Sequence, residues 1–203
     1  YKQDQEIKIY NLTKNGELTI SDLPMGTYEI EETKTLDGLV LNTTKYEVKF
    51  EQKDTVTKIY EQKLDVKNDT TLVEFSKTDI TGDKELAGAK LTVLDSEGNI
   101  IDTWTSTKET HKIQGLTVGK EYTLKEEIAP DGYVLATEIK FKVEETNEIQ
   151  KVTMIDKIVE ISKEDISGNE IEGAKLQVID KDDNVIDECI SEKEAHRVKG
   201  LKE

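Results

Sequence analysis

The run YTLKEEI, which begins at Tyr122, places a carboxyl group among apolar side chains. If this run is a β-strand, alternate side chains point to opposite faces, so Glu126 shares a face with Tyr122, Leu124 and Ile128, while Glu127 lies on the other. An ionised carboxylate on a buried face is costly unless it has a partner or takes up a proton. We therefore interpret Glu126 as an inward proton donor or acceptor, and we expect other charges to point into the same core.

A lysine and an aspartate also alternate with apolar residues. Lys77 follows Val73 and Phe75 at alternate positions, and Asp156 ends the run VTMID, in which alternate residues are again apolar. Buried lysines are rare, and desolvation favours the neutral amine and the protonated carboxyl group. From the residues alone two interpretations stay open. The group is either a structural ion pair inside the core or an amine and a carboxyl poised for condensation.

Seven short segments around these residues have the alternation and turn spacing of β-strands. Turn sequences such as SEGN at 96–99 and TGDK at 81–84 separate them, and no amphipathic helix is evident. We therefore predict an all-β fold in which the strands form an antiparallel β-sandwich. The predicted strands are 73–77, 90–94, 100–105, 111–114, 121–128, 139–143 and 151–155.

The sequence contains an internal repeat with a period of about 85 residues. Residues 73–116 read closely onto residues 159–201, and residues 23–41 read onto residues 116–135 with one deletion. The chain is therefore predicted to hold tandem sandwich repeats. The predicted parts are the C-terminal part of a first repeat at 1–63, a linker at 64–70, a complete repeat at 71–157 and the N-terminal part of a third repeat at 158–203.

The partial repeats carry incomplete sets of the inward charges. Glu32 takes the place of Glu126, and Lys163 takes the place of Lys77, so both are candidate equivalents. Tyr60 stands at the acceptor position of the first repeat, which leaves that repeat without a clear acceptor. The third repeat would be a half-sandwich with bare edges, which could pair head to tail with the first half-repeat of a neighbouring molecule. The simpler alternative is that the ends are fragment boundaries.

Composition and charge exclude several classes of partner. The chain has 44 acidic and 28 basic residues and a formal net charge of -16, so we expect no nucleic acid and no membrane contact, since binding phosphate requires cations. A single cysteine, Cys189, excludes an internal disulfide. The acidic run 180–184 lacks the spacing of a calcium loop, and neither a metal nor a cofactor is expected. A start at Tyr1 suggests a piece of a longer chain.

Four motifs in a fixed order carry a resemblance to a known family. They are FSK at 75–77, LAGAKL at 86–91, YTLKEEIAPDGY at 122–133 and VTMID at 152–156. Together they resemble the B-repeat (CnaB or SpaA-like, prealbumin-like) domains of Gram-positive collagen adhesins and of sortase-assembled pilin shafts. The resemblance extends over the complete repeat and both partial ones. It implies tandem Ig-like or prealbumin-like β-sandwiches, and the members most similar in character have an aspartate acceptor.

The resemblance also implies an intramolecular isopeptide bond that forms without a cofactor. By motif position, Lys77 would be the amine nucleophile, Asp156 the acceptor carboxyl and Glu126 the general acid and base that moves protons between them. Such a reaction occurs once per molecule. We therefore expect a maturation step and not an enzyme with turnover.

These expectations combine into one functional prediction and two alternatives. We predict structural stalk or shaft repeats of a Gram-positive adhesin or pilin-like protein, extracellular and anchored to the cell wall. The expected partners are neighbouring repeats of the same chain and, through a distal region, a host extracellular matrix protein. The main alternative is a module whose loops bind a host matrix protein or a glycan. A hydrolase using Glu126 and Asp156 is disfavoured, because both alternate into the core and not into a cleft.

Overall fold

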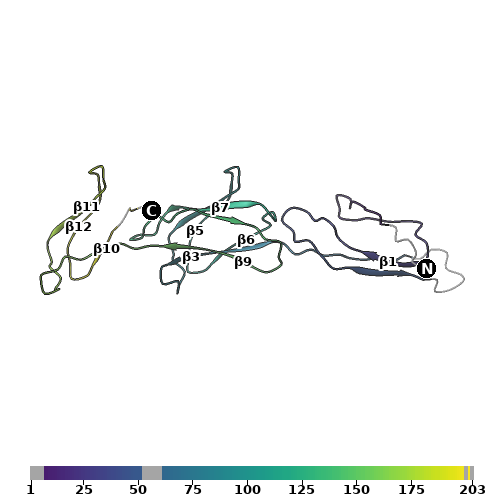
Figure 1. The fold of residues 1–203 in the computed structure, drawn as a ribbon, viewed down its shortest axis with the longest axis horizontal. Helices are drawn as coiled ribbons and strands as arrows, with labels where there is room; N and C mark the ends of the chain where they lie inside the picture. The colour runs from purple at the N-terminus through teal and green to yellow at the C-terminus, as the bar shows by residue number, and fades with distance from the viewer. Residues whose placement is uncertain (1–6, 52–60, 199–200, 202–203) are drawn as a thin grey trace. The chain divides into compact units, whose positions relative to one another are not determined.

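The computed structural model describes residues 7–51, 61–198 and 201 of the chain. The described part contains strands β1 to β13 and no helix (Figure 1). Its residues form two compact units, of which one holds 7–32, 43–51 and 61–66 and the other holds 33–42, 67–198 and 201. Among the described residues, no helix is long and apolar enough to cross a membrane.

The first unit contains a two-stranded antiparallel sheet. Strand β1 (Gly26–Ile30) pairs with β2 (Tyr46–Phe50), and Tyr28 lies opposite Val48. The ring of Tyr28 meets the ring of Phe50 edge-on, with 6.1 Å between their centroids. Residues 23–41, which read onto 116–135 in the sequence, therefore contain a strand with a tyrosine, as residues 121–128 do.

The central repeat is a sandwich of two sheets. One sheet has the order β6-β3-β9 and the other has the order β5-β4-β7-β8. All seven predicted strands are found, and β4 to β7 have the predicted bounds. The strands are β3 (Leu72–Asp79), β4 (Lys90–Leu94), β5 (Ile100–Thr105), β6 (His111–Gln114), β7 (Glu121–Ile128), β8 (Ile139–Lys142) and β9 (Gln150–Asp156).

One strand pairing differs from the predicted antiparallel arrangement. Strands β3 and β9 run parallel, in a register that sets Lys77 opposite Met154 and Asp79 opposite Asp156. Parallel neighbours need a long connection, which the five intervening strands of the repeat provide. The first and last strands of the repeat therefore lie side by side, and Lys77 and Asp156 share one face of their sheet.

The core of the sandwich is formed by alternate side chains from both sheets. The ring of Phe75 lies 5.5 Å from that of Trp104 and 5.4 Å from that of Phe141, centroid to centroid. The buried apolar side chains include Val73, Leu91, Val93, Ile113, Leu124, Val152 and Met154. This close packing holds the strands at fixed positions on both sides of the core.

The third repeat reproduces part of this arrangement. The strands are β10 (Glu160–Ile161), β11 (Lys175–Ile179), β12 (Val185–Ile190) and β13 (His196–Arg197). Strand β10 pairs with β13 and β11 pairs with β12, as β3 pairs with β6 and β4 with β5. Ser191 accepts a hydrogen bond from the Ala174 amide, as Ser106 does from Ala89. The repeat seen in the sequence is therefore also a repeat in structure.

The core packing predicts a strong effect at Leu124 and a weak one at its strand neighbour Ile128. Leu124 is fully buried, whereas the side chain of Ile128 is 58% exposed. We expect Leu124→Ala to lower the free energy of unfolding by about 2 to 5 kcal/mol, because it leaves a cavity. Ile128→Ala, the control, should change it by less than about 0.5 kcal/mol. Urea unfolding followed by the fluorescence of the single tryptophan, Trp104, measures both, and equal effects would contradict the packing described.

Candidate functional site

Three ionisable side chains from three strands meet inside the central sandwich. Lys77 lies on β3 and Asp156 on β9 in one sheet, and Glu126 lies on β7 in the facing sheet. Their exposed fractions are 1%, 0% and 2%, respectively. The structure therefore brings together the three residues that alternation pointed inward.

The lysine amine lies between the two carboxyl groups. Lys77 Nζ is 3.0 Å from Glu126 Oε1, and it donates a hydrogen bond to Asp156 Oδ1. An amine in this position contacts a carboxyl group of each sheet. One charged or hydrogen-bonded cluster thus ties the two layers of the sandwich at a single point.

A β-bulge in β7 lies directly after Glu126 and changes the direction of the side chains that follow it. Lys90 of β4 lies opposite Ile128 of β7, but the next residue, Leu91, lies opposite Glu126, so Glu127 has no partner on β4. A bulge of this kind re-aims side chains locally. It also corrects one expectation, because Ile128, predicted to share the inward face, is exposed once the extra residue shifts the alternation.

Backbone and carboxylate contacts hold the site residues in place. Ala136 N donates to Glu126 Oε2 at 2.7 Å, which leaves Oε1 directed at the amine. Glu85 accepts a hydrogen bond from the Lys77 amide at 2.9 Å and another from the Ser76 hydroxyl. Sequence reasoning missed the roles of both Ala136 and Glu85. A signal existed only for Glu85, which the repeat alignment places on Glu170. Glu85 forms an isolated antiparallel bridge with Thr78, and Glu170 forms one with Glu164.

Burial raises the pKa of Asp156 from its usual 3.8 to about 6. Its hydrogen bond to Lys77 and the charge of that amine act in the opposite direction, while Glu126 adds to the rise. Asp156 Oδ2 has no hydrogen-bond partner among the described residues, although it is fully buried. Both observations favour a carboxyl group that carries a proton more readily than an exposed aspartate does.

The candidate equivalents in the partial repeats have different surroundings. Lys163 is exposed and lies two residues beyond the end of β10 at Ile161. Glu32 is half-buried, two residues after the end of β1. Tyr60, the residue aligned with the acceptor, lies outside the described residues. Roles for Glu32 and Lys163 in a cross-link therefore stay predictions.

The two histidines form surface pairs that recur in both repeats. His111 Nε2 lies 2.7 Å from Asp102 Oδ2, and His196 Nε2 lies 2.7 Å from Asp187 Oδ2. The His111 ring stacks on the indole of Trp104 at 4.1 Å between centroids. Each histidine thus pairs with an aspartate of its own repeat. His111 also covers one face of the Trp104 ring.

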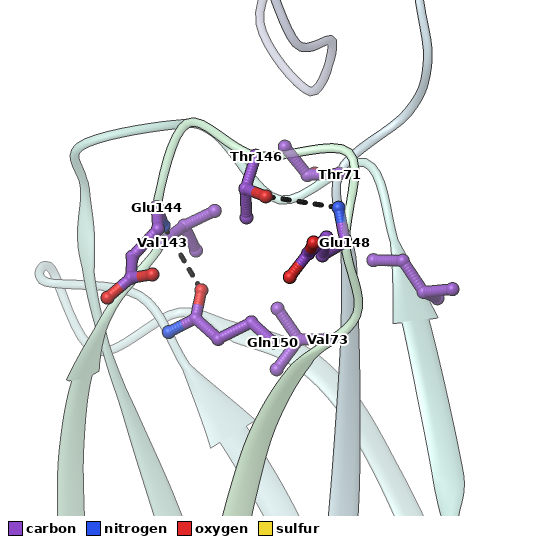
Figure 2. Close-up of a pocket in the computed structure, with 8 residues that line it drawn as sticks. Thr71, Val73, Val143, Glu144, Thr146, Glu148 and Gln150 are labelled. Atoms are coloured by element: carbon purple, nitrogen blue, oxygen red, sulfur yellow. Dashed lines mark hydrogen bonds between the residues drawn. The ribbon is translucent and has the colours of Figure 1, made fainter.

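A shallow hollow at one end of the sandwich does not contain the buried cluster (Figure 2). Two backbone amides close its rim, since Glu148 N donates to Thr146 Oγ1 and Glu144 N donates to Gln150 Oε1, each at 3.1 Å. Its empty volume is about 150 Å³, including open solvent, whereas small-molecule sites are typically about 300 to 1,000 Å³. Within the described ranges, no three side chains of the metal-binding types cluster to hold an ion.

Comparison with known proteins gives one family and several solved structures. The family described as SpaA, prealbumin-like fold domain, matches residues 1–63 and 71–158. The chain is similar to the Bacillus anthracis TIE protein (26% identity, TM-score 0.46, 88% of this chain and 35% of that one). It is also similar to the Streptococcal ancillary pilin (16%, 0.39, 88% and 64%) and to the shaft pilin SpaA from Lactobacillus rhamnosus GG (18%, 0.37, 64% and 64%). It spans only part of the length of each, and no curated protein matches.

The family match agrees with the architecture that the strands form. It covers the first partial repeat and the complete repeat, and the described part is all-β, so the predicted fold class is confirmed. The family is described by its fold, and shaft pilins are among the solved structures that this chain resembles. The chain belongs to the SpaA family of prealbumin-like fold domains.

Proposed function

We propose that the chain forms stalk or shaft repeats of a Gram-positive surface protein of the adhesin or pilin type, and that an amide bond between Lys77 and Asp156 closes its central repeat. The observation that carries this proposal is the lysine amine buried between two carboxyl groups, one of which lies on the last strand of the repeat. A purely structural ion pair would account for the burial. It would not require a second carboxyl group beside the same amine.

The proposed reaction is a condensation with Glu126 as the proton relay. The neutral Lys77 amine attacks the carboxyl carbon of protonated Asp156, a C–N bond forms, and one C–O bond breaks to release water. Glu126 takes a proton from the attacking amine and returns it to the departing oxygen, so the glutamate is unchanged at the end. The contact between Nζ and Oδ1 and the rigid strands on both sides supply the proximity that this reaction needs.

The bond would join the first and last strands of the repeat. Lys77 and Asp156 are 79 residues apart in sequence. By analogy with the loop entropy of disulfides, closing such a loop stabilises the fold by about 4 to 5 kcal/mol. Because β3 and β9 are parallel neighbours, a load applied to the two ends of the repeat would pass from one strand to the other through the bond. The strands between them would not be unzipped.

The cellular location and the partners of such a protein follow from the same proposal. Pilin-type repeats work outside the cell, anchored to the cell wall, and associate with neighbouring repeats, which fits the family match. The alternative glycan-binding role gains no support from Trp104, because His111 covers one face of its ring. A host matrix partner and head-to-tail self-association stay predictions.

Intact mass spectrometry tests the amide bond directly. We expect the chain to be lighter than its sequence mass by one water. Glu126→Ala should keep the fold, as judged by Trp104 fluorescence, but lose the deficit, because no group relays the proton. Glu127→Ala is the matched control, since this exposed neighbour pairs with Lys125 at the surface and should leave the deficit intact. An unmodified chain at full sequence mass would refute the bond, and a deficit in Glu126→Ala would refute the relay.

The protonation of Asp156 can be tested where the bond cannot form. In Lys77→Met the group that lowers the Asp156 pKa is removed, so the carboxyl should titrate at or above about 6 in carbon-13 NMR spectra. Asp79 is an internal control, because hydrogen bonds from Thr81 lower its pKa below 3.8. A midpoint for Asp156 near 3.8 would contradict the role of burial.

The same variant should have a pH-dependent stability. The folded state binds the Asp156 proton more tightly than the unfolded state does, because the folded pKa is the higher one. This contribution to the free energy of unfolding is therefore complete below the unfolded value of 3.8, and it is lost as the pH rises through the folded pKa. Urea unfolding of Lys77→Met across this pH range measures it, and a contribution that grows with rising pH would contradict the sign.

A further inference from the structure

A loop that contains Asp-Gly follows strand β1 and Glu32 in the first repeat, and a similar loop follows strand β7 in the central repeat. The two loops are residues 33–42 and 130–136. Their glycines, Gly38 and Gly132, have the same backbone angle, with φ at +82°. The proposed amide bond uses neither loop as a reactant, yet both carry a dense set of polar contacts.

The first loop belongs to the first repeat by sequence, but it lies in the same compact unit as the central repeat. Gly38 O accepts a hydrogen bond from Thr71 N at 3.1 Å, and Val40 N donates to Asp69 O at 2.8 Å. Asn68 Nδ2 donates to Val40 O at 2.9 Å. The loop is thus bonded to the segment through which the chain enters the central sandwich.

Gly38 also lies against the end of β6 without room for a side chain. A Cβ atom at this buried position would lie 2.6 Å from Gly115 O, which is backbone and cannot move aside cheaply. Thr71, only 2% exposed, completes the receiving surface. Its hydroxyl donates to Leu116 O at 2.6 Å, and its carbonyl accepts from Gly115 N at 3.0 Å.

The second loop meets the corresponding part of the third repeat. A Cβ at Gly132 would lie 3.4 Å from Arg197 Cβ, and the Arg197 guanidinium lies 6.0 Å from the centroid of the Tyr133 ring. Leu135 N donates to Leu201 O at 3.0 Å. Because the repeat alignment sets Leu201 on Leu116, both loops contact the segment that follows the same strand of the next repeat.

We propose that this Asp-Gly loop is a docking element that each repeat presents to the next one. Its receptor is the end of the β6-type strand and the residues after it, which in the central repeat are Gly115 and Leu116 with Thr71. The partner is the next repeat of the same chain, whose backbone at Gly115 leaves room only for a glycine at position 38. The docking does not depend on the amide bond, since neither Lys77 nor Asp156 takes part in these contacts.

Alanine at Gly38 tests the docking, and alanine at Gly98 is the matched control. Gly98 lies in a turn of the central repeat with φ at +83°, and a Cβ there meets nothing within 4 Å, so this variant carries the backbone strain alone. We expect Gly38→Ala to speed hydrogen exchange of the Thr71 and Val40 amides on the order of tenfold, and Gly98→Ala to leave both rates unchanged. Unchanged rates in Gly38→Ala, or equal changes in the two variants, would overturn the proposal.

Two further variants of the full chain keep the test decisive. Asn68→Ala removes the side chain that donates a hydrogen bond to Val40 O, and this side chain is not part of the sandwich core. The variant should also speed exchange of the Val40 amide. Gly132→Ala should speed exchange of the Leu135 amide, but by a smaller factor than Gly38→Ala speeds exchange of the Thr71 amide. The reason is that the nearest neighbour of Gly132 is the flexible side chain of Arg197. Trp104 fluorescence verifies in each case that the central repeat is folded. If Asn68→Ala and Gly132→Ala both leave these amides unchanged, the loops do not dock.

Discussion

The burial of one lysine amine is the constraint on which the central repeat depends. A cation removed from water must be compensated or neutralised, and Glu126 and Asp156 approach Lys77 Nζ for that purpose from opposite sheets. Their positions require the two layers to pack in one register, the alternation along β7 to point Glu126 inward and β9 to lie beside β3. The apolar core around them supplies the low polarity that raises the pKa of Asp156.

The sequence predicted the local features of this site and missed the non-local ones. Alternation is a property of a single strand, so it was enough to place Lys77, Glu126 and Asp156 inside. The pairing of β3 with β9 joins strands far apart in the chain, and no pattern within either strand reveals its parallel direction. The bulge that exposes Ile128 and the amide of Ala136 that holds Glu126 depend on backbone geometry, which side-chain patterns do not record.

The partial repeats show that residue identity alone does not create the buried cluster. Lys163 has the same preceding residues as Lys77 in kind, but it is exposed, and an exposed lysine amine remains solvated. Glycines 38 and 132 likewise share one backbone angle, yet only the first lies against backbone atoms at a distance that excludes a side chain. In both comparisons the neighbouring strands, and not the motif, decide what a residue does.

The parallel pairing of β3 with β9 has a consequence for survival among proteases. An amide bond between these strands would make the repeat a closed ring of chain, with Lys77 and Asp156 as its junctions. A cut in any loop between the two junctions would open that ring but leave the pieces covalently joined. Only a cut outside the ring would sever the chain, so the exposed loops of the central repeat between the two junctions could be nicked without loss of the distal end.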